Sequence, residues 1–388
     1  MTSRTRFWVL IVSTPVIVFA VIGGYLGQAM AKDDTYQHLR VFEDVVSLVL
    51  NNYVEEVDVK KAMRGALNGL AAGLDADSGL LPANMVTAYE SNAAPAAGEL
   101  GVELARQYYL RIVSVREGSP AAKAGLRSGD FIRAIDKRST KDISVFEGDR
   151  LLRGQPGSKV SLLVIRGNAA DPHEVDLTRE RVTTPELTSK MADATTGYVH
   201  VMEFSKRSPA LIKQAFDALA KTGASRYVLD LRGAVKGDLD DGTAAARLFV
   251  KAGALSVKES KGGTKETVSA QAGDGAITAP VVLVVNQSTA RAGEVFAAAL
   301  SGSKRADLVG QHTLGSAARQ RLVKLPDGTA LLISYQRYLA PDGSAIHEKG
   351  LEPAVTVDEP DVDFGTIAPT TDATLERALQ YIEQKKAA

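Results

Sequence analysis

The chain has 388 residues, of which 45% are hydrophobic, and its formal net charge is zero. This length exceeds what one ordinary hydrophobic core accommodates, so we expect two or three domains. The balanced charge gives no electrostatic reason to expect a nucleic-acid partner. The five His residues are scattered without metal-ligand spacing, and the absence of Cys excludes disulfides and thiolate catalysis. We therefore expect a folded multidomain protein without a metal or cofactor.

The N-terminus is predicted to carry an export or anchoring signal. Arg4 and Arg6 precede an apolar run from Phe7 to Leu26, which is long enough to span a bilayer because a helix needs roughly 20 residues to do so. Basic residues before such a run keep the N-terminus in the cytoplasm. The small residues Ala29 to Ala31 would suit signal peptidase, so an anchor and a cleaved signal peptide at 1–31 both remain open. We expect a cell-envelope protein, either anchored in the inner membrane with periplasmic or extracytoplasmic domains, or secreted.

Residues 35–96 are predicted to form a helical region. Apolar residues recur at helical spacing from Thr35 to Val57, and a second amphipathic segment runs from Val59 to Leu74. The turn residues Asp75 to Gly79 end this pattern.

Short strands separated by Gly, Pro and Asp are predicted over residues 97–182. Strands are indicated at Gly101 to Leu104, Leu110 to Val115, Phe131 to Ile135 and Val160 to Ile165, with one short helix opening at Ser119 and another ending before Gly154. The order of these elements and their glycines resembles a PDZ domain. Such a domain adds an extended peptide to a sheet edge and captures its terminal carboxylate with backbone N–H groups.

The PDZ resemblance implies a peptide-binding role for the segment that opens the first strand. Gly98 to Gly101 would form the carboxylate-binding loop, and Leu100, Val102 and Leu104 would line an apolar pocket with Val145 or Leu152. Packing in the core of the domain remains the alternative for each apolar residue, because alternating residues in a strand suit either role.

Strands and helices alternate over residues 183–360, and a helix capped by Asp372 is predicted within 361–388. Strands are indicated at Tyr198 to Val201, Tyr227 to Leu231 and Val281 to Val285, and helices at Pro209 to Leu219 and Glu294 to Leu300. This alternation implies crossover connections and an α/β sheet. Gly262 to Gly275 is rich in Gly, Ser and Thr and is predicted to be a loop.

Ordered motifs in this region resemble the carboxyl-terminal processing, or tail-specific, serine peptidases. The motifs are Asp230-Leu231-Arg232-Gly233, Val284 to Ala290, Leu308-Val309-Gly310 and Gly350-Leu351-Glu352-Pro353. The resemblance spans roughly Val41 to Val357 and implies a ClpP/crotonase-like α/β peptidase core behind the PDZ domain. It also implies that the partners are C-terminal tails of envelope proteins, and a homo- or hetero-oligomer formed through the N-terminal helices stays open.

Both catalytic positions of that family are substituted in this chain. Aligned on the family motifs, Arg291 stands at the Ser nucleophile and Ser316 at the Lys base, while Gln320 matches a Gln that follows the Lys. A Ser hydroxyl attacks only when a neighbouring base accepts its proton. Arg stays protonated and offers hydrogen-bond donors only, so it serves neither role.

The oxyanion loop departs from the family pattern as well. Its equivalents here are Lys236 and Gly237, with Lys236 in place of a Gly, and Ala292 after the nucleophile position. The resemblance therefore predicts a peptidase fold without proteolytic activity. Arg291 would either bind an anion together with Lys236, form a local ion pair with Glu294, or have no role.

Three functions remain open from the sequence. The first is an inactive peptidase homologue that recognises C-terminal tails through its PDZ domain. The second is an active serine endopeptidase with a rearranged centre such as His312 and Ser316, although Gly310 and Gly315 favour a loop in which residues four apart do not face one another. The third is a non-catalytic assembly partner of an active homologue.

Overall fold

The computed structural model describes residues 36–141, 143–167, 171–183, 185–358, 362–366 and 371–387. The expected membrane segment at 7–26 and the signal peptidase site at 29–31 lie outside these residues. Among the helices that are described, none is both long and apolar enough to cross a membrane. The chain divides into two compact units, Met1–Ala66 and Leu67–Ala388.

The N-terminal helical region contains the elements that its periodicity predicts. Residues 36–52 are helical, and helix α2 (Val59–Ala72) starts after Asp58, whose carboxylate accepts the N–H of Lys61 at 3.0 Å. A carboxylate in this position satisfies one of the unpaired N–H groups at a helix start. Many apolar side chains of the 36–52 helix are exposed, among them Leu39, Val45 and Leu48.

The predicted PDZ domain is a six-stranded antiparallel sheet with two short helices. Its strand order is β2-β3-β4-β6-β7, with β5 paired to β4. The elements are β2 (Val102–Gln107), β3 (Tyr109–Val115), α4 (Pro120–Lys123), β4 (Phe131–Ile135), β5 (Arg138–Ser139), α5 (Val145–Leu152), β6 (Lys159–Ile165) and β7 (His173–Thr178). Strand β2 is at the sheet edge and packs beside α5. An edge strand next to a helix is where a PDZ domain adds a peptide strand.

A second six-stranded sheet forms the centre of the C-terminal half. Its order is β17-β14-β13-β10-β9-β8, and all neighbours are parallel except β8 and β9. The strands are β8 (Leu187–Met191), β9 (Thr196–Val201), β10 (Arg226–Asp230), β13 (Val281–Val285), β14 (Ala306–Gly310) and β17 (Val355–Thr356). This confirms the α/β class that the alternating pattern predicts.

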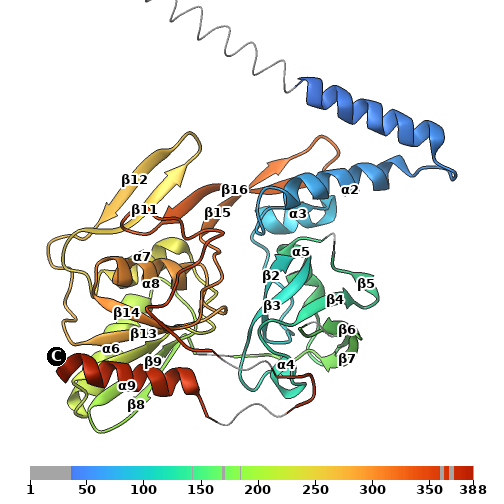
Figure 1. The fold of residues 1–388 in the computed structure, drawn as a ribbon. Coiled ribbons are helices and arrows are strands. Elements are labelled where there is room, and N and C mark those ends of the chain that lie inside the picture. The colour runs from blue at the N-terminus through green and yellow to red at the C-terminus, as the bar shows by residue number, and fades with distance from the viewer. Residues whose placement is uncertain are drawn as a thin grey trace, which may run out of the picture. The chain divides into compact units, whose positions relative to one another are not determined.

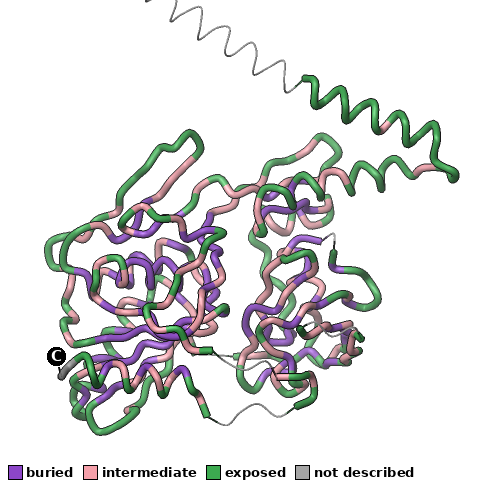
Figure 2. Tube along the Cα trace, in the orientation of Figure 1, coloured by how far each residue is buried: buried purple, intermediate pink, exposed green. Residues whose placement is uncertain are grey.

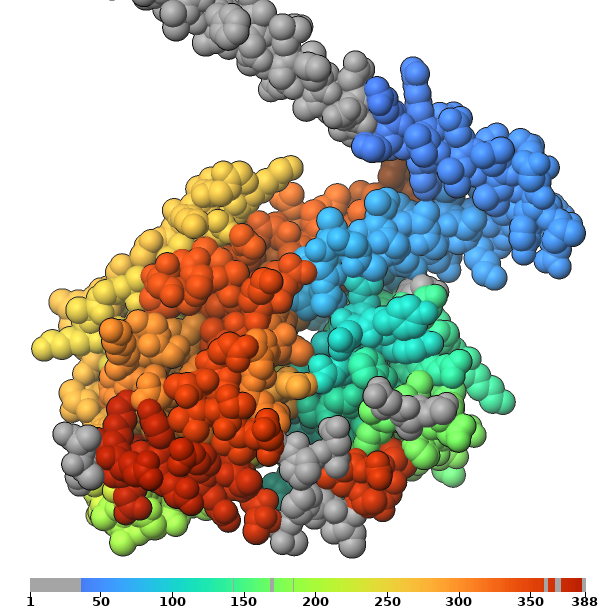
Figure 3. Space-filling view, viewed as in Figure 1, coloured from blue at the N-terminus to red at the C-terminus, as the bar shows by residue number. Residues whose placement is uncertain are grey.

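Helices cover both faces of this sheet. Helices α6 (Ser208–Lys221), α7 (Leu239–Ala246) and α8 (Ala292–Gly302) belong to the core that includes Leu283 and Val285, whereas α9 (Ala373–Ala387) packs on Val282 and Val284. Consecutive residues of a strand point to opposite faces, so a fully buried strand needs apolar residues at every position. Every residue of β13 is buried, as the purple tube in Figure 2 shows for the strands and helices at the centre of this half. Helix α9 lies across the outer face of the sheet (Figure 1), and its dark red atoms form part of the surface in Figure 3.

A third sheet joins the segment before the PDZ domain to the C-terminal half. Its order is β1-β16-β11-β12, with β15 paired to β16. The elements are β1 (Gly79–Leu81), β11 (Ala254–Ser260), β12 (Thr264–Ser269), β15 (Ala318–Lys324) and β16 (Ala330–Leu339), with α3 (Ala83–Glu90) packed against β16 and β1 through Leu81, Val86, Ala330 and Leu332. Through β1, the turn at residues 75–79 is held against the C-terminal half.

The expected loop at Gly262 to Gly275 is wrong in part, because Thr264–Ser269 forms β12, paired antiparallel with β11. Nearly all residues of β12 are exposed on both faces. The strand therefore lacks the alternation of apolar and polar residues by which a half-buried strand is recognised.

Candidate functional site

Residue 291 lies on the sharp turn between strand β13 and helix α8. Its backbone has φ 51° and ψ −119°, a conformation that residues other than glycine rarely adopt. The turn before it is fixed by hydrogen bonds, because Asn286 Oδ1 accepts the N–H of Ser288 at 2.8 Å and the Thr289 hydroxyl donates to the Leu231 carbonyl at 3.0 Å. The strand, turn and helix thus present residue 291 in a strained and well-defined position.

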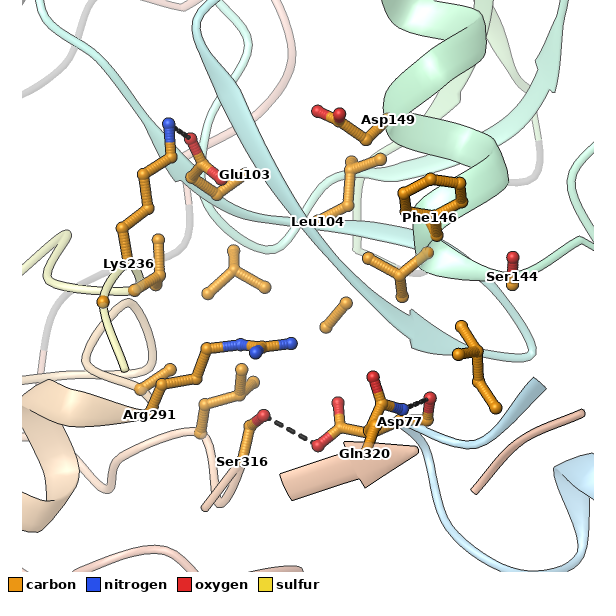
Figure 4. A pocket seen from close by; sticks show the side chains of 18 of the residues that line it. Asp77, Glu103, Leu104, Ser144, Phe146, Asp149, Lys236, Arg291, Ser316 and Gln320 are labelled. Atoms are coloured by element: carbon orange, nitrogen blue, oxygen red, sulfur yellow. Dashed lines mark hydrogen bonds and ion pairs between the residues drawn. The ribbon is translucent and has the colours of Figure 1, made fainter. Parts of the chain in front are cut away.

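The Arg291 side chain extends into a pocket of about 420 Å³ (Figure 4). Leu104, Val145 and Phe146 of the PDZ domain line this pocket together with Ser316 and Gln320. Within the described residues, the Arg291 guanidinium makes no hydrogen bond and no ion pair.

Glu294 is not the partner of the Arg291 side chain, so the ion pair that the sequence left open is not formed. Glu294 is fully buried and accepts the N–H groups of Gly315 at 2.6 Å and Ser316 at 2.8 Å, as well as the Thr313 hydroxyl. Burial raises the pKa of Glu294 to about 7, and these donors only partly oppose the rise. The residue holds the loop of Ser316 against the start of α8.

Ser316 is a neighbour of Arg291, but its side chain is hydrogen-bonded to another residue. Its hydroxyl donates to Asp77 Oδ2 at 2.8 Å, and the side-chain amide of Gln320 donates to the Asp77 carbonyl (Figure 4). Asp77 belongs to the turn before β1, more than two hundred residues earlier in the chain. The sequence motifs did not identify Asp77 as a site residue, because only the pairing of β1 with β16 brings it here.

A buried histidine adjoins this turn. The ring of His347 is 7% exposed, and its nitrogens lie 3.7 Å from Asp75 and 3.9 Å from Asp77. Burial alone would lower the pKa of His347, but the two carboxylates raise it. Burial likewise would raise the pKa of Asp75, but hydrogen bonds, including one from His347, hold it well below its usual range. Sequence reasoning did not find this cluster, since its members are distant in the chain.

The other imidazole near the site does not form the rearranged pair. His312 is 43% exposed and its Nε2 lies 3.6 Å from Glu352. No hydrogen bond joins His312 to Ser316 among the residues described. Gly315 turns the intervening loop with φ 83°, which is the loop geometry that the glycines predict.

The loop that the sequence motifs align with the family's oxyanion loop has free backbone donors. Gly237 has φ 113°, and a Cβ there would lie 2.3 Å from the carbonyl oxygen of Phe204, so the position requires glycine. In the part of the chain that is described, the N–H groups of Gly237 and Ala292 have no hydrogen-bond partner. The Lys236 side chain turns away from Arg291 and forms an ion pair of 2.8 Å with Glu103 of β2 (Figure 4).

Of the residues expected to bind peptide in the PDZ domain, some line the pocket and others are buried in the domain core. Leu104 lines the pocket with Val145, whereas Leu100, Val102 and Leu152 are buried in the PDZ core. Gly101 has φ 77°, and a Cβ there would lie 2.3 Å from the Cβ of Ser119. The glycine is therefore needed for the turn that leads into β2, and peptide binding by these residues stays a prediction.

Comparisons with known proteins agree with this geometry. A family model described as peptidase family S41 matches residues 195–357, and a PDZ domain model matches residues 111–166. The chain is 30% identical over 375 residues to the carboxy-terminal processing protease CtpA of Bacillus subtilis, covering 93% of this chain and 79% of that protein. It is 33% identical over 277 residues to the carboxyl-terminal-processing protease of Synechocystis sp., covering 70% of this chain and 65% of that protein.

Among solved structures, a photosystem II D1 C-terminal processing protease matches with a TM-score of 0.68 and 28% identity, over 82% of this chain and 86% of that one. The fold and the strained turn place the chain in the class of S41 serine peptidases with a PDZ domain. The chain belongs to the carboxyl-terminal processing protease family, which confirms the resemblance seen in its motifs.

Proposed function

We propose that this chain is a proteolytically inactive carboxyl-terminal processing peptidase homologue that binds the C-terminal tails of other envelope proteins. The observation that carries the proposal is the position of Arg291. Its guanidinium extends from the turn where the family carries the Ser nucleophile, and a protonated guanidinium neither attacks a carbonyl nor accepts a proton. Loss of the Ser nucleophile in a well-studied serine peptidase lowers kcat on the order of a million-fold.

The base position supports the same conclusion. Ser316 donates its hydroxyl proton to the Asp77 carboxylate at 2.8 Å, and a carboxylate is generally a far weaker base than the desolvated Lys of a Ser–Lys dyad. At the positions that match the family's oxyanion donors, Gly237 and Ala292 have unpartnered N–H groups among the described residues. Nucleophilic attack by Ser316 would need a second set of such donors at its own position.

Binding of a tail is supported by the open edge of β2 beside α5. Leu104 from β2 and Val145 and Phe146 from α5 line the same pocket as Arg291. An extended peptide added to β2 would place its apolar side chains against these residues. The basic and apolar N-terminus supports a location in the cell envelope.

A second candidate function rests on the helix at residues 36–52. Its exposed apolar residues include Leu39, Val45, Leu48 and Val49, and a contiguous apolar face on a helix indicates a partner helix. The helix would then pair with another copy or with an active homologue. Size measurement of the full-length protein in detergent, alone and with such a homologue, tests this role separately from tail binding.

The inactive state is tested with purified full-length protein in detergent. The protein is incubated with an unstructured substrate that ends in a free C-terminal tail, and in parallel with a serine-directed fluorophosphonate probe. We expect no cleavage and no labelling beyond that of a Ser316→Ala control. Robust cleavage that is lost in Ser316→Ala would overturn the proposal.

A further inference from the structure

We propose that Arg291 is an anion-binding residue that captures the terminal carboxylate of a bound tail at the former nucleophile position. This inference rests on the proposed tail-binding function and names the group of the ligand that the site recognises. It assigns a binding role to a residue that takes no part in hydrolysis.

The first observation is the charge balance of the pocket. Arg153 forms ion pairs with Glu99 at 2.7 Å and Asp149 at 3.0 Å, and Lys236 is paired with Glu103. Of the cations from described residues that line the pocket, Arg291 is the one without an ion-pair partner. An unpaired guanidinium in a partly enclosed site gains more from an incoming anion than one already paired.

The second observation is the location of Arg291 between two adjoining pockets. A further pocket of about 410 Å³ is lined by Asp238, Arg319 and Tyr335, and it shares Arg291 and Gln320 with the first. Its own cation is neutralised, since Arg319 is paired with Asp238 at 2.6 Å and with Asp240 at 2.7 Å. A tail that enters along the PDZ groove therefore meets its first unpaired positive charge at Arg291.

The third observation is a free backbone donor in the lining of both pockets. Gly237 lines both pockets, and its N–H group has no hydrogen-bond partner in the described part of the chain. A carboxylate is planar and accepts two parallel hydrogen bonds from one guanidinium, which leaves further lone pairs for N–H donors. These donors suit a permanent carboxylate as well as a transient oxyanion.

The described acidic residues that line the pocket form no ion pair with Arg291. Glu103 is shared by Lys236 and Arg116, and Asp149 is paired with Arg153. Asp77 accepts the Ser316 hydroxyl and lies 3.9 Å from His347.

The PDZ loop is a second candidate site for the carboxylate, because the N–H groups of Leu100 and Gly101 have no hydrogen-bond partner among the described residues, whereas its other two are occupied. The N–H groups of Gly98 and Glu99 already donate to the carbonyls of Gly154 at 2.9 Å and Glu180 at 2.8 Å. The Glu99 carboxylate also lies in this loop, paired with Arg116 at 2.5 Å and with Arg153. Arg291 differs from this loop in offering a full, unpaired positive charge, and charge-assisted hydrogen bonds to a carboxylate are stronger than those from neutral N–H groups.

The test uses full-length protein in detergent and two pools of short, randomised, fluorescently labelled peptides. The pools differ only in whether the C-terminus is a free acid or an amide, and binding is followed by fluorescence polarisation. We expect the wild-type protein to prefer the acid pool. Arg291→Gln should weaken acid binding about 10- to 100-fold, because a hydrogen-bonded charge pair is lost, and should weaken amide binding much less, because the amide forms no charge pair.

Two further variants separate the possible causes. Arg291→Lys keeps the charge without the planar fork and should give an intermediate loss, which also shows that the site tolerates substitution. Leu104→Ala removes an apolar contact from the groove without changing its charge and should weaken both pools alike.

The possible failures are distinguishable. An acid preference of unchanged size in Arg291→Gln would place the carboxylate elsewhere, overturning this inference while tail binding stands. If neither pool binds the wild-type protein, the proposed function fails and the inference fails with it.

Discussion

The N–H of Arg291 donates a hydrogen bond of 3.0 Å to the carbonyl oxygen of Ser316. The two positions that the sequence motifs align with the family's dyad are therefore neighbours, held together by their backbones. Their side chains take different directions, since that of Arg291 enters the pocket and that of Ser316 is hydrogen-bonded to Asp77. Because Glu294 also binds the N–H groups of Gly315 and Ser316, the framework of the site is independent of the two substituted side chains.

This retained framework predicts that the dyad can be rebuilt. The double variant Arg291→Ser with Ser316→Lys should cleave an unstructured tail at least about 100-fold faster than either single variant, because general-base assistance contributes at least that factor. The measurement is peptide cleavage together with fluorophosphonate labelling of the full-length protein.

Asp77 should limit the rebuilt enzyme. A carboxylate beside an ammonium group keeps that group protonated, and a protonated Lys does not act as a base. Adding Asp77→Ala to the double variant should therefore raise its rate and shift its pH optimum downward. An inactive triple variant with an intact fold would show that the oxyanion loop is not competent.

The strained backbone at residue 291 predicts a stability difference between two small side chains. Arg291→Gly relieves the positive φ of 51°, whereas Arg291→Ala keeps the Cβ that causes the strain. We expect the glycine variant to have the larger free energy of unfolding, by about 1 kcal/mol. Denaturant titrations of the two variants check this. A more stable alanine variant would mean that the turn is not strained.

The sequence predicted the elements around the site better than their contacts. Fully apolar Val281 to Val285, followed by turn residues and a helix, is enough to predict the strand, turn and helix that carry Arg291. The capping role predicted for Asp372 is also confirmed, since its Oδ1 accepts the N–H of Leu375 at 2.9 Å. Such local signals are readable because periodicity and capping involve neighbouring residues.

Contacts between segments that are distant in the chain could not be predicted from such local signals. The approach of Asp77 to Ser316 depends on the β1–β16 pairing, and nothing in a short turn specifies its partner strand. Likewise, the sequence placed Arg291 near Glu294 by spacing alone, whereas the structure directs Glu294 inward to the loop of Ser316. Tertiary structure, not sequence distance, decides which charges meet.

Arg232 links the oxyanion loop to the C-terminal helix. It forms ion pairs of 2.6 Å with Asp230, which is buried, and with Asp372, the cap of α9. Arg232→Ala should lower the free energy of unfolding by about 3 kcal/mol, because it leaves the Asp230 carboxylate buried and unpaired.

A matched double variant isolates this effect. Adding Asp230→Asn to Arg232→Ala should recover part of the lost free energy of unfolding, since the unpaired charge of the Asp230 carboxylate is removed. Thermal unfolding of the three proteins provides the comparison. Equal losses in the single and double variants would show that Arg232 acts through packing and not through its charge.

Because the buried carboxyl group of Glu294 has a raised pKa, we expect the protein to become less stable as the pH rises. Its pKa in the folded protein is about 7, above the ordinary 4.5, so the folded state binds the proton more tightly than the unfolded state. The stabilising contribution is complete below pH 4.5 and is lost as the pH rises to about 7, which lowers the free energy of unfolding by up to roughly 3 kcal/mol. The raised pKa of His347 acts in the same direction, so wild-type data alone do not isolate Glu294.

Glu294→Gln separates the two contributions. Its amide cannot ionise, so its pH profile should lack the part of the slope due to Glu294 and keep the part due to His347. The variant should also be less stable than the wild type at low pH, because the amide N–H₂ would face the N–H of Gly315 or Ser316. Denaturant titrations at several pH values, with Glu117→Gln at an exposed position as the control, measure both effects. Parallel profiles for the wild type and Glu294→Gln would mean that Glu294 does not titrate between pH 4.5 and 7, and that its carboxylate is held ionised by the loop donors throughout this range.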